Sequence, residues 1–345
     1  MYRECLKLDD VDTTGAQLRV IARLFSRRSD AEGNAMASPE SQVLRERYRS
    51  MTARMAADPQ MDLTSMRSLF DEVVHLTAEP EDVTYAEVAT GPVSGIWCRP
   101  LHASAEHVIL YLHGGGFVAN SAATHRKLAA HLANAAGCRA FLVDYRRAPE
   151  HQFPAQLEDA VAAYRWLLDQ GIKPDNILSA GDSAGGNLAL STVLQLRNAD
   201  EPLPAGIIAF SPWLDMHATG ETLDSNAESD ALINRNVLAT MSALYLGPQG
   251  SPTDPLASPL LAELGGLPPI FVAVGADEAL LSDAQRLVAS ARRSAVQAEL
   301  IIGERQQHVY PIMAGRCPEA DAVIAMAGAW ALRRFGTPRE GTIHG

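Results

Sequence analysis

A serine between small residues, at the end of an apolar segment, is the first group in this sequence that could do chemistry. The segment GDSAG (residues 181–185) follows the apolar run Ile177–Ala180 and opens the helical pattern Gly185–Leu196. A tight strand-to-helix turn needs small neighbours around its central residue, and the glycines at both ends meet that need. The turn would raise the Ser183 hydroxyl above the sheet, beside the positive end of the helix dipole. We therefore predict that Ser183 is a nucleophile, against the simpler interpretation of an ordinary glycine-rich turn.

A run of three glycines offers the second chemical feature. The segment HGGGF (residues 113–117) follows the apolar run HVILYL (residues 107–112). Glycines leave backbone N–H groups open to a ligand, and each such donor aimed at a developing oxyanion lowers an acyl-transfer barrier by about 3–4 kcal/mol. We predict that the N–H groups of Gly114, Gly115 and Ala184 bind an oxyanion. A phosphate-binding loop is the alternative, but neither G-x-G-x-x-G nor GK[ST] is present.

A serine hydroxyl becomes a good nucleophile only when a base takes its proton and a carboxylate orients that base. For a serine on this kind of turn, the chain order is Ser, then Asp or Glu, then His. Two histidines, His308 and His344, follow the next apolar run, Ile270–Val274. His344 lies in a polar tail, whereas His308 follows the apolar stretch Ala298–Ile302. We therefore predict that His308 is the base.

The acid should lie just beyond the end of a strand. Asp277 has this position, three residues after the run Ile270–Val274, and we predict that it orients His308. Asp283 is the main alternative, although its place suits an N-terminal cap of the helical pattern 283–294. Glu278 is the second alternative.

These groups need elements that bring them together. Apolar runs alternate with amphipathic helical patterns from about residue 107 onward, which is typical of βαβ units and predicts a mostly parallel sheet flanked by helices. Residues 1–80 have mainly helical patterns, including one helix face formed by Leu18, Ile21, Leu24 and Phe25. We predict an N-terminal helical cap segment over residues 1–80 and a catalytic core over residues 81–345. The stretch 212–260 interrupts the alternation and reads as a second cap insertion.

Composition narrows the function further. The chain has 345 residues, 47% of them hydrophobic, and a net charge of −12. An acidic chain argues against a nucleic-acid or anionic-membrane partner. The four cysteines form no CxxC pair and no HExxH occurs, so we expect no metal site and no cofactor. Neither an apolar leader nor a run of membrane-span length is present, which predicts a cytoplasmic protein without stable membrane insertion.

Taken together, these segments resemble the bacterial hormone-sensitive-lipase-like esterases of the α/β-hydrolase fold. The matching segments are HGGGF (113–117), DYRRAPEHQFPA (144–155), GDSAGGN (181–187), SPWLD (211–215) and DEALLSD (277–283). The resemblance implies an ester hydrolase with Ser183, Asp277 and His308 as its triad. It also implies a helical cap built from the N-terminus and from an insertion after the SPW segment, which matches residues 1–80 and 212–260.

The expected activity is therefore serine-dependent hydrolysis of short-chain acyl esters through an acyl-enzyme intermediate, with a small-molecule ester as partner. Phe117, Trp213 and Leu214 are the bulky residues that we expect to face the substrate pocket. An amidase or deacetylase would use the same triad, and a non-catalytic small-molecule receptor could keep the same scaffold. A homo-oligomer is compatible with the sequence.

Overall fold

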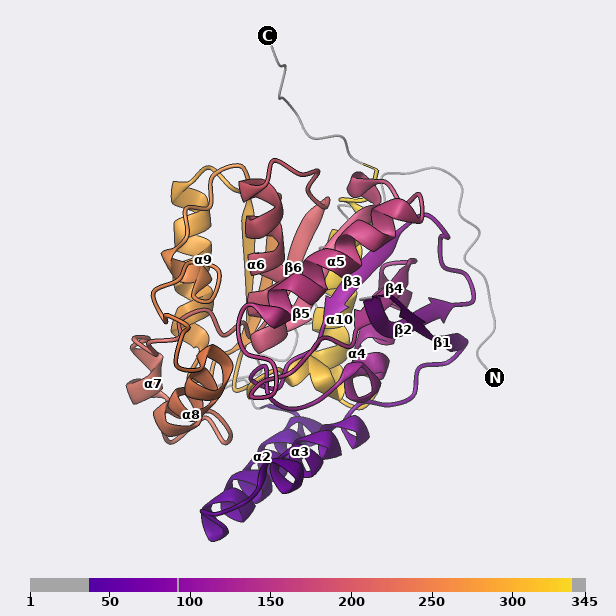
Figure 1. Ribbon diagram of the computed structural model, residues 1–345. Coiled ribbons are helices and arrows are strands. Elements are labelled where there is room, and N and C mark those ends of the chain that lie inside the picture. Colours follow the sequence, from indigo (N-terminus) through magenta and orange to yellow (C-terminus); the bar gives the residue numbers. More distant parts are fainter. Residues whose placement is uncertain (1–36, 92, 337–345) are drawn as a thin grey trace, which may run out of the picture. The chain divides into compact units, whose positions relative to one another are not determined.

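A mixed eight-stranded sheet forms the centre of the molecule (Figure 1). The computed structural model describes residues 37–91 and 93–336, so the helix predicted around Leu18 and Phe25 lies outside the described residues. The helices and strands named below belong to residues 38–345, which form one unit. The strands, in chain order, are β1 (Val83–Thr90), β2 (Val93–Pro100), β3 (Val108–Leu112), β4 (Arg139–Val143), β5 (Ile177–Asp182), β6 (Gly206–Phe210), β7 (Ile270–Gly275) and β8 (Ala298–Gly303).

The order of strands across the sheet is β1-β2-β4-β3-β5-β6-β7-β8. Only the β1–β2 and β2–β4 pairs are antiparallel, and the other pairs are parallel. Every residue of β3, β5, β6 and β7 is buried, as expected for continuous apolar runs covered by helices on both faces. The predicted mostly parallel sheet is confirmed.

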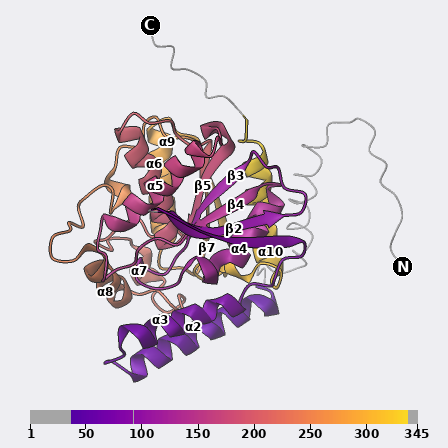
Figure 2. The same cartoon turned by 45° about the vertical axis from the view of Figure 1, so that its right-hand side comes forward.

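Helices cover both faces of the sheet (Figures 1 and 2). On one face α4 (Ala122–Ala135) packs against α10 (Pro318–Leu332), and on the other α5 (Ala155–Asp169) packs against α6 (Ala184–Asn198). Helix α9 (Leu281–Arg293) packs against β7 and β8. Short 3-10 turns precede β5 and follow β8: η2 (Pro174–Asn176) and η4 (Tyr310–Met313).

The remaining helices come from the two segments that the sequence assigned to a cap. Helices α2 (Pro39–Ala57) and α3 (Leu63–Asp71), with the turn η1 (Glu72–His75), precede the first strand. Helices α7 (Thr222–Ser225) and α8 (Arg235–Leu246), with the turn η3 (Pro259–Leu261), lie between β6 and β7. Ser38 caps the N-terminus of α2 by accepting a hydrogen bond from the Ser41 N–H, and Asn234 caps α8 in the same way.

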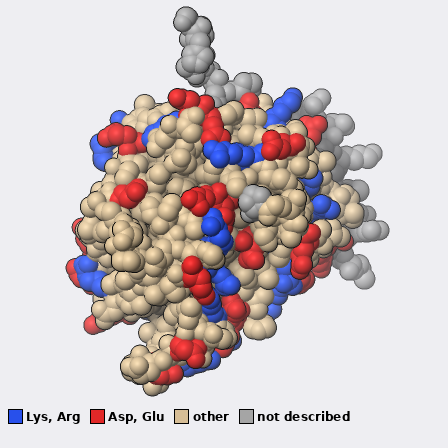
Figure 3. Space-filling model, in the orientation of Figure 1, with Lys and Arg blue, Asp and Glu red and all other residues tan. Residues whose placement is uncertain are grey.

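The surface mixes charges of both signs. Figure 3 shows acidic and basic side chains interspersed over one face of the molecule, without a continuous basic area among the described residues there. Within the described ranges, no helix is both long and apolar enough to cross a membrane.

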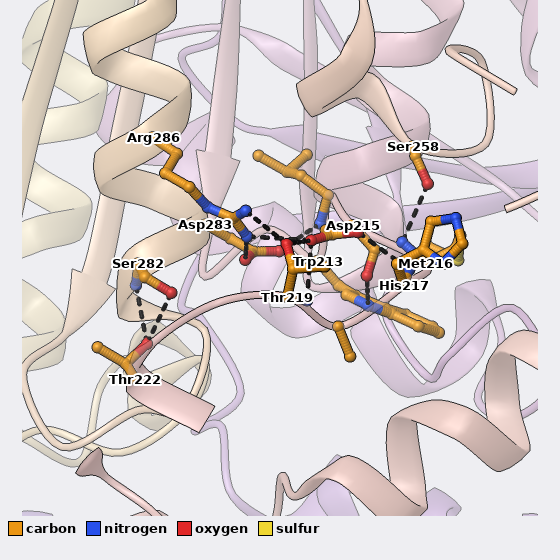
Figure 4. Close-up of polar contacts among 12 residues, drawn as sticks. Trp213, Asp215, Met216, His217, Thr219, Thr222, Ser258, Ser282, Asp283 and Arg286 are labelled. Carbon is orange, nitrogen blue, oxygen red and sulfur yellow. Dashed lines mark hydrogen bonds and ion pairs between the residues drawn. The ribbon is translucent and has the colours of Figure 1, made fainter. Parts of the chain in front are cut away.

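An ionic network of two buried carboxylates and the partly exposed Arg286 holds the loop that follows β6 (Figure 4). Asp283, on the first turn of α9, accepts hydrogen bonds from the Leu214 N–H at 2.9 Å and from Arg286 at 2.6 Å. Arg286 also reaches Asp215 at 3.2 Å, and Asp215 accepts the N–H groups of His217 and Thr219. Burial raises the pKa of Asp283 to about 6, although the Leu214 N–H and Arg286 oppose that rise. Asp283 therefore serves the packing of this loop.

Replacing Asp283 tests this structural role. The Asp283→Ala variant leaves the Leu214 N–H buried without an acceptor and removes one partner of Arg286. We expect the free energy of unfolding to fall by about 2–4 kcal/mol. Urea unfolding followed by circular dichroism would show a lower midpoint with an unchanged slope. An unchanged midpoint would contradict the role, and Glu221→Ala, at an exposed position nearby, is the control.

Candidate active site

Ser183 lies at the sharp turn between β5 and α6. Its backbone has φ 53° and ψ −119°, a left-handed conformation that residues other than glycine rarely adopt. A Cβ atom at Gly181 would strike the Gly185 carbonyl, and one at Gly185 would strike the Leu112 carbonyl. The GDSAG pattern is therefore a steric requirement of this turn, which places the serine side chain at the end of the sheet.

His308 contacts both Ser183 and a carboxylate. Its Nε2 lies 2.9 Å from Ser183 Oγ, and its Nδ1 lies 2.9 Å from an Oε2 of Glu278. All three side chains are buried. Their order along the hydrogen-bonded chain is hydroxyl, imidazole, carboxylate, which is the arrangement that lets a histidine take a proton from a serine.

The prediction of Asp277 as the carboxylate on His308 is corrected by this geometry. Asp277 points away from the imidazole and pairs with Arg45 of α2 at 3.6 Å, and both side chains are partly exposed. The next residue, Glu278, is fully buried and binds His308, so the carboxylate on the imidazole lies one position further along the chain. The other alternative, Asp283, binds Leu214 and Arg286.

Glu278 has two further partners that sequence reasoning missed. Ser211, directly after β6, donates its hydroxyl to Glu278 Oε1 at 2.6 Å, and the Gly275 N–H binds the same oxygen. The Ser211 oxygen in turn accepts the N–H of Val309 at 2.9 Å. The SPWLD segment contained the signal, since its serine lies at the end of the strand next to β7.

A second buried carboxylate supports the same turn from the insertion. Asp230 accepts the Ala279 N–H at 2.8 Å, and its other oxygen accepts the N–H groups of Leu232 and Ile233. Asp230 thus ties the segment before α8 to the residue that follows Glu278. Sequence patterns gave no sign of this contact, because the two residues are far apart in the chain.

The charge of Glu278 governs the basicity of His308. Burial by itself would lower the pKa of His308, but the hydrogen bond and negative charge of Glu278, with smaller effects of Asp230 and Asp182, outweigh it. The pKa of His308 is therefore raised above its ordinary value, which favours uptake of a proton from Ser183.

The loop of Gly114, Gly115 and Gly116 lies beside Ser183, and not all three glycines line the cavity there. Gly115 and Gly116 line the cavity at Ser183. Gly114 packs against Asp182, whose carboxylate a Cβ there would strike, so Gly116 rather than the predicted Gly114 accompanies Gly115 at the cavity. Within the described part of the chain, the N–H groups of Gly115, Gly116 and Ala184 donate to no protein acceptor.

Asp182 packs against Gly114 of the glycine loop and is held by two polar partners. Its carboxylate accepts the Tyr111 hydroxyl at 2.9 Å and lies 3.3 Å from Nε2 of His125. Burial would raise the pKa of Asp182, but His125 and Tyr111 outweigh it, so the pKa of this carboxyl is lowered. Asp182 is thus an anion beneath the glycines.

The cavity at Ser183 is small and mainly apolar, with a volume of about 60 Å³. Trp213 lines it, as predicted, whereas Phe117 and Leu214 are not among the lining residues. Phe117 stacks on Tyr245 with ring centroids 3.8 Å apart, and Leu214 is fully buried. The bulky lining comes instead from the two cap segments, with Tyr48, Met51 and Phe70 from the first and Leu238 and Met241 from α8. Among the described residues, no group of three or more His, Cys, Asp or Glu side chains could hold a metal ion.

Comparisons with known proteins agree with this architecture. The family model described as alpha/beta hydrolase fold matches residues 109–312. An acetyl-hydrolase of Streptomyces hygroscopicus is 35% identical over 295 residues, covering 86% of this chain and 97% of the relative. An esterase of Acinetobacter venetianus is 34% identical over 274 residues, covering 79% of this chain and 90% of its own length.

Solved structures give the same result. The crystal structure of an esterase from the bacterial hormone-sensitive lipase family has a TM-score of 0.83 at 40% identity, and the match covers 88% of this chain and all of that one. The crystal structure of EstE5 soaked with p-nitrophenyl butyrate has a TM-score of 0.80 at 36% identity, covering 87% of this chain and all of that one. The chain therefore belongs to the α/β-hydrolase family, among the bacterial hormone-sensitive-lipase-like esterases.

Proposed function

We propose that this enzyme is a serine carboxylic-ester hydrolase that cleaves short acyl esters through an acyl-enzyme intermediate. The observation that carries the proposal is the chain of two 2.9 Å contacts from Ser183 through His308 to Glu278. Ser183 and His308 line a cavity together with Gly115 and Gly116, whose N–H groups donate to no acceptor among the described residues. A nucleophile, a base, an orienting acid and oxyanion donors in one site are the parts that acyl transfer needs.

In the first half of the reaction, Ser183 Oγ attacks the carbonyl carbon of the ester while His308 Nε2 takes the hydroxyl proton. The carbonyl electron pair moves onto oxygen, where the N–H groups of Gly115, Gly116 and Ala184 stabilise the negative charge. The resulting tetrahedral intermediate then collapses. Its bond to the alcohol oxygen breaks, and that oxygen receives the proton from His308. The acyl group then remains on Ser183.

In the second half, a water molecule replaces the alcohol. His308 takes a proton from the water as its oxygen attacks the acyl carbon, and the Ser183 oxygen leaves and regains that proton. Glu278 stays ionised throughout, holds the imidazole in one orientation and stabilises its positive charge. Ser211 and Gly275 keep the Glu278 carboxylate in place by their own hydrogen bonds.

The preference for short acyl chains rests on the size of the cavity. A water-sized group needs about 10–15 Å³ of such space, so about 60 Å³ has room for roughly four to six such groups, which sets an upper limit of about six carbons on the acyl chain. The names of similar proteins point the same way, since one is an acetyl-hydrolase and another was soaked with a butyrate ester.

The cytoplasm is the location we propose. Cys98, Cys138 and Cys317 are buried free thiols, and such thiols persist in a reducing compartment.

The mixed surface charges in Figure 3 support a small-molecule ester, rather than a nucleic acid, as the partner.

Covalent labelling tests the nucleophile. A p-nitrophenyl phosphonate should modify Ser183 with one equivalent per chain, and peptide mass mapping would locate the adduct. Ser183→Ala should lose the label and about 10⁶-fold in kcat. A label on another residue, together with full activity of Ser183→Ala, would rule out the proposed nucleophile.

Two neighbouring residues give a matched test of the acid. Glu278→Gln removes the charge that orients His308, and we expect kcat to fall by about 10⁴-fold. Asp277→Asn should change kcat by less than about threefold, because a partly exposed ion pair contributes little. Steady-state kinetics with p-nitrophenyl acetate measures both, and the reverse ranking would return the role to Asp277.

Acyl-chain length tests the pocket. The value of kcat/KM for p-nitrophenyl esters should rise from acetate as added CH₂ groups are buried, each contributing about 0.8 kcal/mol, and should drop beyond hexanoate. The Met241→Ala variant, which shortens a cavity-lining side chain of α8, should move the maximum to longer chains. Values of kcat/KM that climb through palmitate in the unmodified enzyme would contradict the small cavity. Faster turnover of matched amides than of the esters would reveal an amidase.

A further inference from the structure

We propose that Tyr48, on helix α2 outside the hydrolase core, is a positioning residue for His308. Its hydroxyl donates a hydrogen bond to the main-chain carbonyl of His308 at 3.0 Å. The proposal rests on the function of His308 as the base. It makes the first cap helix part of the machinery that orders the active site, in addition to its role as a wall of the cavity.

The peptide unit that follows His308 is held at both of its polar ends. Its carbonyl oxygen accepts from Tyr48 of the cap, and its N–H, which belongs to Val309, donates to Ser211 of the core. The two contacts come from opposite ends of the same peptide plane. Together they determine the rotation of that plane and so the direction in which the His308 side chain leaves the backbone.

The segment around His308 is also held through its neighbour Gln307, whose side chain bonds to the Ser229 carbonyl and to the Ala231 N–H, but the peptide unit after His308 depends on the two contacts above. The segment lies between β8 and η4 and forms neither helix nor strand. Val309 has φ 50°, a left-handed conformation that a β-branched residue adopts only when its surroundings hold it there. Loss of one of the two contacts would therefore let the peptide unit relax and carry the imidazole away from Ser183 or Glu278.

Tyr48 is well suited to this contact. Its side chain is buried and lines the cavity. Burial, with the negative charges of Glu278, Asp182 and Asp230, holds the pKa of Tyr48 well above its ordinary value, so the phenol stays a neutral donor. The ring can pack against the substrate while the hydroxyl holds the backbone.

Other tethers of α2 lie close by and provide a control. The Thr52 hydroxyl, one turn further along α2, bonds to the Ala231 carbonyl at 2.7 Å, and Arg45 bonds to the Ser229 carbonyl at 3.1 Å. Both attach α2 to the segment that precedes α8 and do not contact His308. The Thr52 hydroxyl also bonds to the Tyr48 carbonyl within α2 at 3.0 Å. Thr52→Val therefore removes a hydroxyl tether of the same helix and leaves the Tyr48 hydroxyl with its bond to His308 in place.

The experiment compares Tyr48→Phe with Thr52→Val. Tyr48→Phe keeps the ring and removes only the hydroxyl, so we expect KM to stay within twofold while kcat falls about 10- to 100-fold, the range typical of a small misplacement of a catalytic group. Thr52→Val should keep kcat within twofold, even if its melting temperature falls by as much as that of Tyr48→Phe. Titration of active sites with a p-nitrophenyl phosphonate, at a concentration that labels every folded molecule, separates slower chemistry from partial unfolding.

The pH profile gives a second readout that a purely structural role would not move. Activity requires neutral His308, so kcat/KM rises as pH passes the pKa of His308. Glu278 is the main group that raises this pKa, with Asp230 and Asp182 also facing the imidazole. Loosening the Glu278 contact in Tyr48→Phe should shift this rise to lower pH, whereas Thr52→Val should leave it in place.

The outcomes separate this proposal from the proposed function. Equal losses of kcat in the two variants, or a Tyr48→Phe enzyme with unchanged kcat and pH profile, would overturn the role of Tyr48. Failure of the function itself would appear elsewhere, as activity retained by Ser183→Ala. If Tyr48→Phe cannot be recovered folded, Tyr48→Met, whose adaptable side chain also lacks a hydroxyl, should show the same selective loss of kcat.

Discussion

A carboxylate removed entirely from water, that of Glu278, is the constraint around which the active site is arranged. An unpaired charge at this depth would cost several kcal/mol. The protein compensates it with three donors, from His308, Ser211 and Gly275. Because these donors come from the ends of β6 and β7 and from the loop after β8, the need to satisfy one charge brings three loops into a fixed relation.

Burial of this charge also explains why the surrounding loops carry so many polar contacts to backbone. The Ser211 hydroxyl donates to Glu278 and accepts the N–H of Val309, so one hydroxyl links the carboxylate to the residue after His308. Asp230 secures the residue that follows Glu278 from the insertion, and Tyr48 reaches the His308 carbonyl from α2. The hydrolase core supplies the reacting groups, while both cap segments help to hold the loops that present them.

Much of this site could be predicted because local sterics leave a clear trace in sequence. Gly181 and Gly185 are required by the turn that raises Ser183, and the order of serine, acid and histidine follows from the order of the strands. The choice between Asp277 and Glu278 could not be made in this way, because both residues follow the same strand. Which of them turns inward depends on the partners that the neighbouring strand provides.

The prediction of the pocket residues was partly wrong, because a large apolar residue near the site can be buried without lining the cavity. Phe117 and Leu214 are large and close to the site in sequence, but Phe117 stacks on Tyr245 of α8 and Leu214 is fully buried. The cavity is lined by cap residues whose helices were predicted, although the faces they present were not. Hydrophobic patterns identify a buried side of a helix, and that side can cover either a core or a substrate.

The contact between Tyr48 and His308 joins residues 260 positions apart, and this separation has a consequence for biosynthesis. At a translation rate of about 5–20 residues per second, helix α2 leaves the ribosome roughly 13–52 seconds before its partner exists. During that time Tyr48, which lies with Leu44 and Met51 on the buried side of α2 in the finished molecule, lacks the carbonyl that its hydroxyl binds. Helix α2 is thus made early, and its contact with the active-site histidine forms only after most of the chain that separates them has been made.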